Sequence, residues 1–238
     1  DVNVLIESIV HVASKAALAK QSLILPSDVI LSNKTGVTLI VNSGDGGNVA
    51  QLRKNALVGG ASASKNYQLY SSHHSMWSKE GLSRVWNGSR VTVDGATFKK
   101  LKLSAGSVVE TINGGNQYVV TSKDSARPTV VKSPSSIVFM AQDASNSVPT
   151  LGKISAATAK SLLLSGKSSS NGSFPALSSD SVAQVFDQLS SGVQQFYVIN
   201  SAQDQKTIAQ AVDAVATGNV KSAVDADSAV QSFLGGKK

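Results

Sequence analysis

Three short apolar runs, rich in β-branched residues, constrain the fold of this chain more than any other feature. They occupy residues 37–42, 137–141 and 195–199, and each gives way to polar residues at its end. Short runs of this composition are typical of β-strands. Two of the runs lead through polar turns into helical patterns, at residues 48–57 and up to residue 215. We therefore expect α/β organisation in these parts, and the three strands can share one sheet.

The middle of the chain predicts antiparallel hairpins. Residues 90–103 are centred on Asp94-Gly95, a dipeptide that tolerates the positive φ of a tight hairpin turn. Residues 108–120 repeat the plan around residues 113–116, and residues 129–132 form a further expected strand. Earlier in the chain, Pro26 predicts an edge position or a break in an extended segment at residues 22–31.

Helical spacing dominates the two ends of the chain. Residues 3–20 predict an amphipathic helix, and from about residue 151 we expect helices at residues 154–164, 179–189 and 223–234. A further helix ends near residue 215. Its expected signals are capping-box spacing of Ser201 and Asp204, and Gly218 at its C-terminus. The apolar face of the first helix is expected to consist of Leu5, Ile9, Val12, Ala13 and Ala16.

Together these patterns predict a mixed α+β fold. An antiparallel β-rich region of hairpins or a meander, with an N-terminal amphipathic helix, runs over residues 1–150. A mostly helical region with one strand follows over residues 151–238. A sheet shared by residues 37–42, 137–141 and 195–199 would make the two regions one continuous domain.

The composition excludes several classes of protein. The 238 residues include no Cys, which excludes disulfides, Cys-ligated metal sites and thiol nucleophiles. Hydrophobic residues make up 41% of the chain, enough for a folded core. No run approaches 18 apolar residues, so we expect no membrane span. We also expect no cofactor.

The net charge of +7 comes from one segment, residues 51–107. This segment has only Glu80 and Asp94 as acidic residues, and it contains both tryptophans, Trp77 and Trp86. Basic groups interleaved with aromatic rings suit a polyanion or an acidic partner surface. The basic residues are Arg53, Lys54, Lys65, Lys79, Arg84, Arg90, Lys99, Lys100 and Lys102.

Three interpretations of this basic-aromatic segment remain open. On a strand over residues 97–103, Phe98, Lys100 and Lys102 would share one face and could contact a single-stranded nucleic acid. The same face could instead meet an acidic protein surface. In the third interpretation the lysines only protect a solvent-exposed edge strand, and the tryptophans lie in the core.

Catalysis and metal binding have little support in the sequence. The Gly-rich turn at residues 43–48 matches neither the Walker pattern nor the dinucleotide fingerprint, and a tight turn explains it. His73 and His74 are adjacent, so on a strand they would point to opposite faces. No nucleophile-elbow motif is present. We expect no enzyme activity, no catalytic residue and no metal site.

These observations predict a non-enzymatic structural protein that assembles with copies of itself, in first place a viral (phage-type) capsid or virion component. The expected location is a virion or the extracellular space. Missing thiols, few charges and abundant small hydroxyl residues are consistent with this function. The contact would join basic and acidic regions of neighbouring copies. Its expected residues are Arg53, Lys54, Arg84, Arg90, Lys99, Lys100, Lys102, Trp77 and Trp86 on the basic side, and Asp213, Asp225 and Asp227 on the acidic side.

Two other functions remain as alternatives. An extracellular adhesin or carbohydrate-binding module would use Tyr67, Tyr70, Trp77 and Trp86 as a sugar platform. A nucleic-acid-binding protein would use the basic-aromatic segment.

Overall fold

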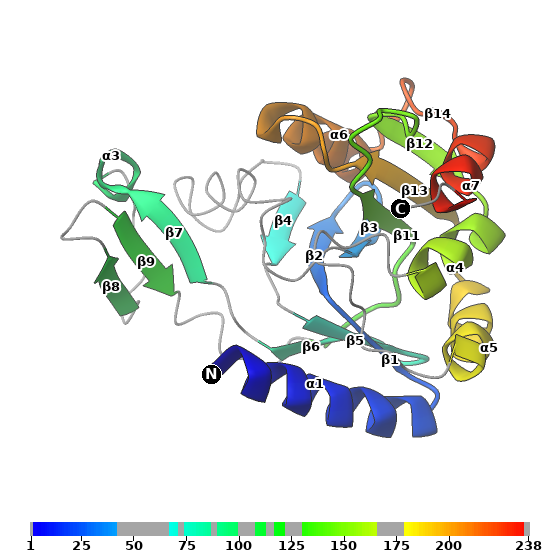
Figure 1. Ribbon diagram of the computed structural model, residues 1–238, viewed down its shortest axis with the longest axis horizontal. Helices are drawn as coiled ribbons and strands as arrows, with labels where there is room; N and C mark the ends of the chain where they lie inside the picture. The colour runs from blue at the N-terminus through cyan, green and yellow to red at the C-terminus, as the bar shows by residue number, and fades with distance from the viewer. Residues whose placement is uncertain are drawn as a thin grey trace.

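A computed structural model describes most of the chain (Figure 1). The described residues are 2–41, 67–70, 74–86, 90–99, 108–112, 117–121, 130–165 and 179–235. The expected helix at residues 48–57 and the turn at residues 43–48 lie outside them.

A seven-stranded sheet forms the centre of the fold. Its three parallel neighbours β13, β11 and β3 correspond to the three apolar runs, so the prediction that these runs share a sheet is confirmed. The sheet also takes strands from both sides of residue 150. In spatial order the strands are β14 (Val224–Asp225), β12 (Leu151–Ile154), β13 (Gln195–Asn200), β11 (Ser136–Ala141), β3 (Gly36–Val41), β2 (Ser27–Ser32) and β4 (Tyr67–Tyr70).

Helices cover both faces of this sheet, which explains why the three parallel strands are apolar over most of their length. On one face, Ile40 and Val138 are buried in a core with Ile208 and Val212 of α6 (Gln205–Thr217). The other face packs against α4 (Ala156–Ser165), α5 (Ser179–Ser190) and α7 (Asp227–Gly235). The predicted α+β class, with an N-terminal helix, strands and a helical C-terminal region, is confirmed.

A four-stranded antiparallel sheet lies below the large sheet in Figure 1. Pro26 separates its strand β1 from β2 of the large sheet, as the predicted break required. Gly81 follows the turn between β5 and β6 at φ +131°, where a Cβ would clash with the Val131 carbonyl oxygen. Only glycine fits there. The strands in order are β1 (Leu23–Leu25), β5 (His74–Ser78), β6 (Gly81–Trp86) and β10 (Val130–Val131).

Helix α1 (Val2–Ala19) forms where it was predicted, but its predicted apolar face is wrong. Val10, Ser14 and Ala17 are buried, whereas Ile9 is 46% exposed and Val12 is 67% exposed. The helix packs on β1 and α5. The small side chains of Ser14 and Ala17 allow a close approach, and this contact decides which face is buried.

A separate three-stranded sheet, in the order β7 (Arg90–Asp94), β9 (Gln117–Thr121), β8 (Val108–Ile112), lies apart from the larger sheets in Figure 1. The predicted hairpin around residues 113–116 is confirmed, because β8 and β9 pair antiparallel. The predicted hairpin at Asp94-Gly95 is wrong: the chain instead enters the short helix α3 (Gly95–Phe98), and β7 pairs with β9. The Phe98 ring stacks on Tyr118 of β9, with ring centroids 4.1 Å apart, and this contact holds α3 against the sheet.

The C-terminal helices form close to their predicted positions, with three differences. The capping box at Ser201 is wrong, because Asp204 itself caps α6 by accepting hydrogen bonds from Lys206 N–H and Thr207 N–H. The region also contains β12 and β14 besides β13, and α7 begins only at Asp227. Gly218 ends α6 at φ 72°, as predicted.

Candidate functional site

The basic candidates lie on the small β-structures. Lys99 is exposed directly after α3, and its N–H donates to the Gly95 carbonyl at 3.1 Å. By backbone position, Arg90 begins β7 opposite Thr121, and Arg84 lies on β6 opposite Ser75. Because residues 95–98 are helical, Phe98 does not lie on a strand, and the expected strand is wrong at its start. Arg53, Lys54, Lys100 and Lys102 lie outside the described residues.

Asp213 is exposed on α6, but it has a partner within the subunit. Tyr67, which is 5% exposed, donates a hydrogen bond to its carboxylate. Burial, the charge of Asp213 and this hydrogen bond all raise the pKa of the Tyr67 hydroxyl. The carboxylate is therefore held by a residue of β4 and still reaches the surface.

Asp225 and Asp227 differ in their burial and in their hydrogen bonds within the subunit. Asp225 is exposed on β14, and its Oδ1 accepts the Asp227 N–H at 3.1 Å. Asp227 is half-buried, and its Oδ1 accepts the Ser155 N–H at 2.8 Å. Burial raises the pKa of Asp227, but hydrogen bonds from Ser155 and Thr158 outweigh this, so the pKa lies below its ordinary value. Asp227 joins α7 to the start of α4, so we remove it from the contact surface.

The elements that carry Lys99 and Asp225 lie far apart in the molecule. Figure 1, drawn with the longest axis horizontal, places α3 and β7 at one extreme, β14 and α7 toward the other, and α6 between them. The elements of Lys99 and Asp225, α3 with the residue after it and β14, are therefore not neighbours within one subunit. We call the surroundings of Lys99 the basic end, and the two exposed carboxylates of Asp213 and Asp225 together the acidic end.

Some of the aromatic candidates are buried in the core and are not available to a partner or ligand. Trp77 is 1% exposed, and its ring meets Phe186 edge-on, with centroids 6.0 Å apart. As a core residue it contacts no partner, which corrects its place among the assembly residues. With Tyr67 also buried, the sugar platform loses two of its four rings. Trp86 lies on β6 opposite His74 by backbone register.

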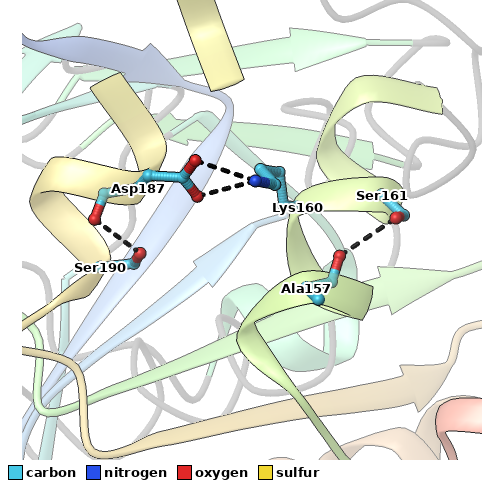
Figure 2. Close-up of polar contacts among 5 residues, drawn as sticks. All are labelled: Ala157, Lys160, Ser161, Asp187 and Ser190. Carbon is cyan, nitrogen blue, oxygen red and sulfur yellow. Dashed lines mark hydrogen bonds and ion pairs between the residues drawn. The ribbon is translucent and has the colours of Figure 1, made fainter. Parts of the chain in front are cut away.

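A salt bridge between α4 and α5 shows charges that are neutralised inside the subunit (Figure 2). Lys160 Nζ lies 2.9 Å from each carboxylate oxygen of Asp187. Both side chains remain partly exposed, so the pair adds about 1 kcal/mol at most. The same view shows Ser161 donating to the Ala157 carbonyl and Ser190 donating to the Asp187 carbonyl.

A buried polar network at the carboxyl ends of β11 and β13 was not predicted. Asn200, fully buried, donates to the carbonyl oxygens of Asp143 and Val148 and accepts from Asp143 N–H and Ala202 N–H. The Asp143 carboxylate accepts from Ser145 and from Val148 N–H. Burial raises the pKa of Asp143, and these hydrogen bonds outweigh the effect and lower it. The polar residues after each apolar run were the available signal. Because its groups pair with one another, the network fixes the loop at residues 142–149 rather than exposing a reactive group.

Within the described part of the chain, no group of three or more His, Asp or Glu residues is placed to hold a metal ion. No helix of that part is long and apolar enough to cross a membrane.

No protein-family model matches this chain, and no curated protein sequence is significantly similar to it.

Proposed function

We propose that this protein is a non-enzymatic structural protein that self-assembles, and that it is a capsid or other virion component of phage type. The observation that supports this best is that the exposed Lys99, directly after α3, and the exposed Asp225, on β14, belong to elements far apart along the longest axis (Figure 1). Charges so far apart do not neutralise one another within a subunit, because exposed charges are screened beyond about 10 Å. In copies arranged head to tail, they meet.

The surface between the ends is suited to burial against a neighbour. Several hydroxyls on the helices or directly after them donate to carbonyls three or four residues earlier: Ser161 to Ala157, Ser191 to Gln188, and Thr217 to Asp213. A polar group that already has a partner is less costly to remove from water than one that loses its solvent partner. Ile9 and Val12 on α1 add exposed apolar area.

In the proposed contact, Lys99 and its basic neighbours meet Asp225 and Asp213 of the next copy. A head-to-tail contact of this kind gives rings if it closes and filaments or lattices if it does not. Each exposed ion pair contributes about 0.2–1 kcal/mol, so assembly depends on several pairs and weakens with salt.

The test is light scattering of the purified protein at micromolar concentration in low salt and in about 0.5 M salt, with electron micrographs of the same samples. We expect regular particles, tubes or fibres at low salt and smaller species at high salt, since salt screens the pairs between copies. A monomer under both conditions would refute the proposal.

Two charge reversals separate a specific contact from a general effect of net charge. Lys99→Glu at the basic end is expected to weaken assembly. Lys79→Glu changes the net charge equally at an exposed turn, where Lys79 bonds only to Gln21 among the described residues. It is expected to assemble like the wild type.

The same preparations test the alternatives. A nucleic-acid-binding protein would bind single strands with an affinity that falls steeply with salt, and it would assemble only in their presence. A carbohydrate-binding module would retain specific glycans on an array.

A further inference from the structure

The sheet β7-β9-β8 has two edge strands, and they are longer than the other edge strands in the described part of the chain. There β7 and β8 each pair only with β9, and each has five residues. The edge strands of the two larger sheets have two to four residues: β1, β4, β10 and β14. Proteins shorten or cover strand edges because unpaired N–H and C=O groups pair readily with another strand. Two five-residue edges are therefore the strongest candidates for strand addition.

The sequence of β7 is complementary to itself. In an antiparallel pair of two β7 strands centred on Thr92, position 90 of one copy lies opposite position 94 of the other. This register places an arginine opposite an aspartate twice, and Val91 opposite Val93 twice. Opposite charges and β-branched pairs are both favourable across strands.

The sequence of β8 disfavours the same arrangement. Its central residue is Glu110, so an antiparallel pair of two β8 strands in the matching register places two glutamates opposite each other. Like charges directly opposite are destabilising.

We infer that two copies of this protein pair through their β7 strands about a two-fold axis at Thr92, forming one continuous six-stranded sheet. The pair would use Arg90 and Asp94, which leaves Lys99 and the acidic end available for the head-to-tail contact. The inference goes beyond the proposed function, because it names a second, symmetric contact. An assembly with one symmetric and one head-to-tail contact can extend in more than one direction.

The absence of Cys from the chain permits a direct test. Thr92→Cys introduces one thiol, which can form a disulfide only with the same position of another copy. Directly opposite Cα atoms in an antiparallel pair are about 4.5 or about 5.5 Å apart, which suits a disulfide. Under mild oxidation we expect most of the Thr92→Cys protein to run as a dimer in denaturing, non-reducing gels. The matched control Glu110→Cys, at the centre of the other edge strand, is expected to stay monomeric in those gels.

A second experiment uses no thiol and covers the case in which Thr92→Cys fails to fold. Arg90→Asp places like charges opposite each other twice and is expected to weaken dimerisation by about tenfold in sedimentation equilibrium. The swap Arg90→Asp with Asp94→Arg restores opposite charges and is expected to recover most of the lost affinity.

The inference is overturned if Thr92→Cys cross-links no faster than Glu110→Cys, or if the charge swap is as weak as the single reversal. A disulfide that joins Thr92→Cys to Glu110→Cys when the two variants are mixed would replace the symmetric pair by a pair of unlike edges. That result would overturn the inference as well.

The proposed function fails separately from this inference. If the wild type forms salt-sensitive assemblies but Thr92→Cys does not cross-link, only the symmetric β7 pair is refuted. A Thr92→Cys protein that cross-links to a dimer, together with a wild type that never grows beyond a dimer, removes the head-to-tail assembly.

Discussion

Asn200 is expected to hold the carboxyl ends of β11 and β13 together, and its substitution should be among the most damaging single changes in this protein. Its side chain is fully buried. It donates to the carbonyls of Asp143 and Val148 at 2.9 and 3.2 Å, and it accepts from Asp143 N–H and Ala202 N–H at 3.2 and 3.0 Å.

The expected cost follows from these partners. Each hydrogen bond contributes about 1 kcal/mol net, and a buried group left without a partner costs about 1–3 kcal/mol. Asn200→Ala removes the bonds and opens some space that water can enter, so we expect a loss of roughly 3–4 kcal/mol in the free energy of unfolding. The exposed Asn219 is a matched control, and Asn219→Ala is expected to change stability by less than about 0.5 kcal/mol.

Asn200→Asp adds a pH signature. The carboxylate keeps the accepted bonds but presents an oxygen to the carbonyls of Asp143 and Val148, which disfavours its charged form and raises its pKa in the folded state. A raised folded pKa stabilises the protein below the unfolded pKa and loses that effect as pH rises through the folded value. The deficit relative to wild type should therefore widen as pH rises above about 4, and then level off.

Urea unfolding followed by tryptophan fluorescence measures both effects, since Trp77 lies in the core. The reasoning is refuted if Asn200→Ala stays within about 1 kcal/mol of the wild type. It is equally refuted if the deficit of Asn200→Asp is independent of pH.

Three further predictions use the same unfolding assay. Gly81→Ala should lower the free energy of unfolding by more than about 3 kcal/mol, because the new Cβ would clash with the Val131 carbonyl oxygen and separate β10 from β6. A variant as stable as the wild type would contradict this. Asp204→Ala removes the N-cap of α6 and should lower the free energy of unfolding by about 1 kcal/mol, whereas Asp204→Asn keeps a capping oxygen and should retain most of the stability. Equal losses in the two variants would show that the cap does not contribute. The pKa values of Asp143 and Asp227 are lowered from 3.8, so the stability that these carboxylates contribute is present above that pH and is lost as pH falls through their folded pKa values. Asp143→Asn should therefore lose less stability on acidification than the wild type. The same dependence of stability on acid pH in the variant and the wild type would contradict this prediction.

The three parallel strands of the central sheet were predictable from local sequence. The runs at residues 37–42, 137–141 and 195–199 are mostly apolar and rich in β-branched residues, and this pattern depends on no distant contact. Gly218 was predictable for a similar reason, since a left-handed residue at a helix end favours glycine.

The failures occurred where distant contacts decide the structure. Asp94-Gly95 permits a tight turn, but Gly95 does not take a positive φ, and the stacking of Phe98 on Tyr118 holds a helix there instead. The buried face of α1 is set by its contacts with β1 and α5, so the face predicted from helical spacing alone was wrong.

The candidate site was predictable only in part. Charge counting identified Lys99 and Asp225, both of which are exposed. It could not identify the commitment of Asp227 to Ser155 or the burial of Trp77, because both depend on tertiary packing. The distance between the elements of Lys99 and Asp225 follows from the arrangement of three sheets, which no local pattern encodes.

A mixing experiment tests head-to-tail assembly most directly. One variant, Lys99→Glu with Lys100→Glu, disables the basic end, and the other, Asp213→Asn with Asp225→Lys, disables the acidic end. By multi-angle light scattering at low salt, we predict that each variant alone stops at a monomer or two-fold dimer, and that an equimolar mixture grows beyond it because each supplies the end that the other lacks. Growth of either variant alone to the size of the wild type, or a mixture no larger than its components, would contradict the account.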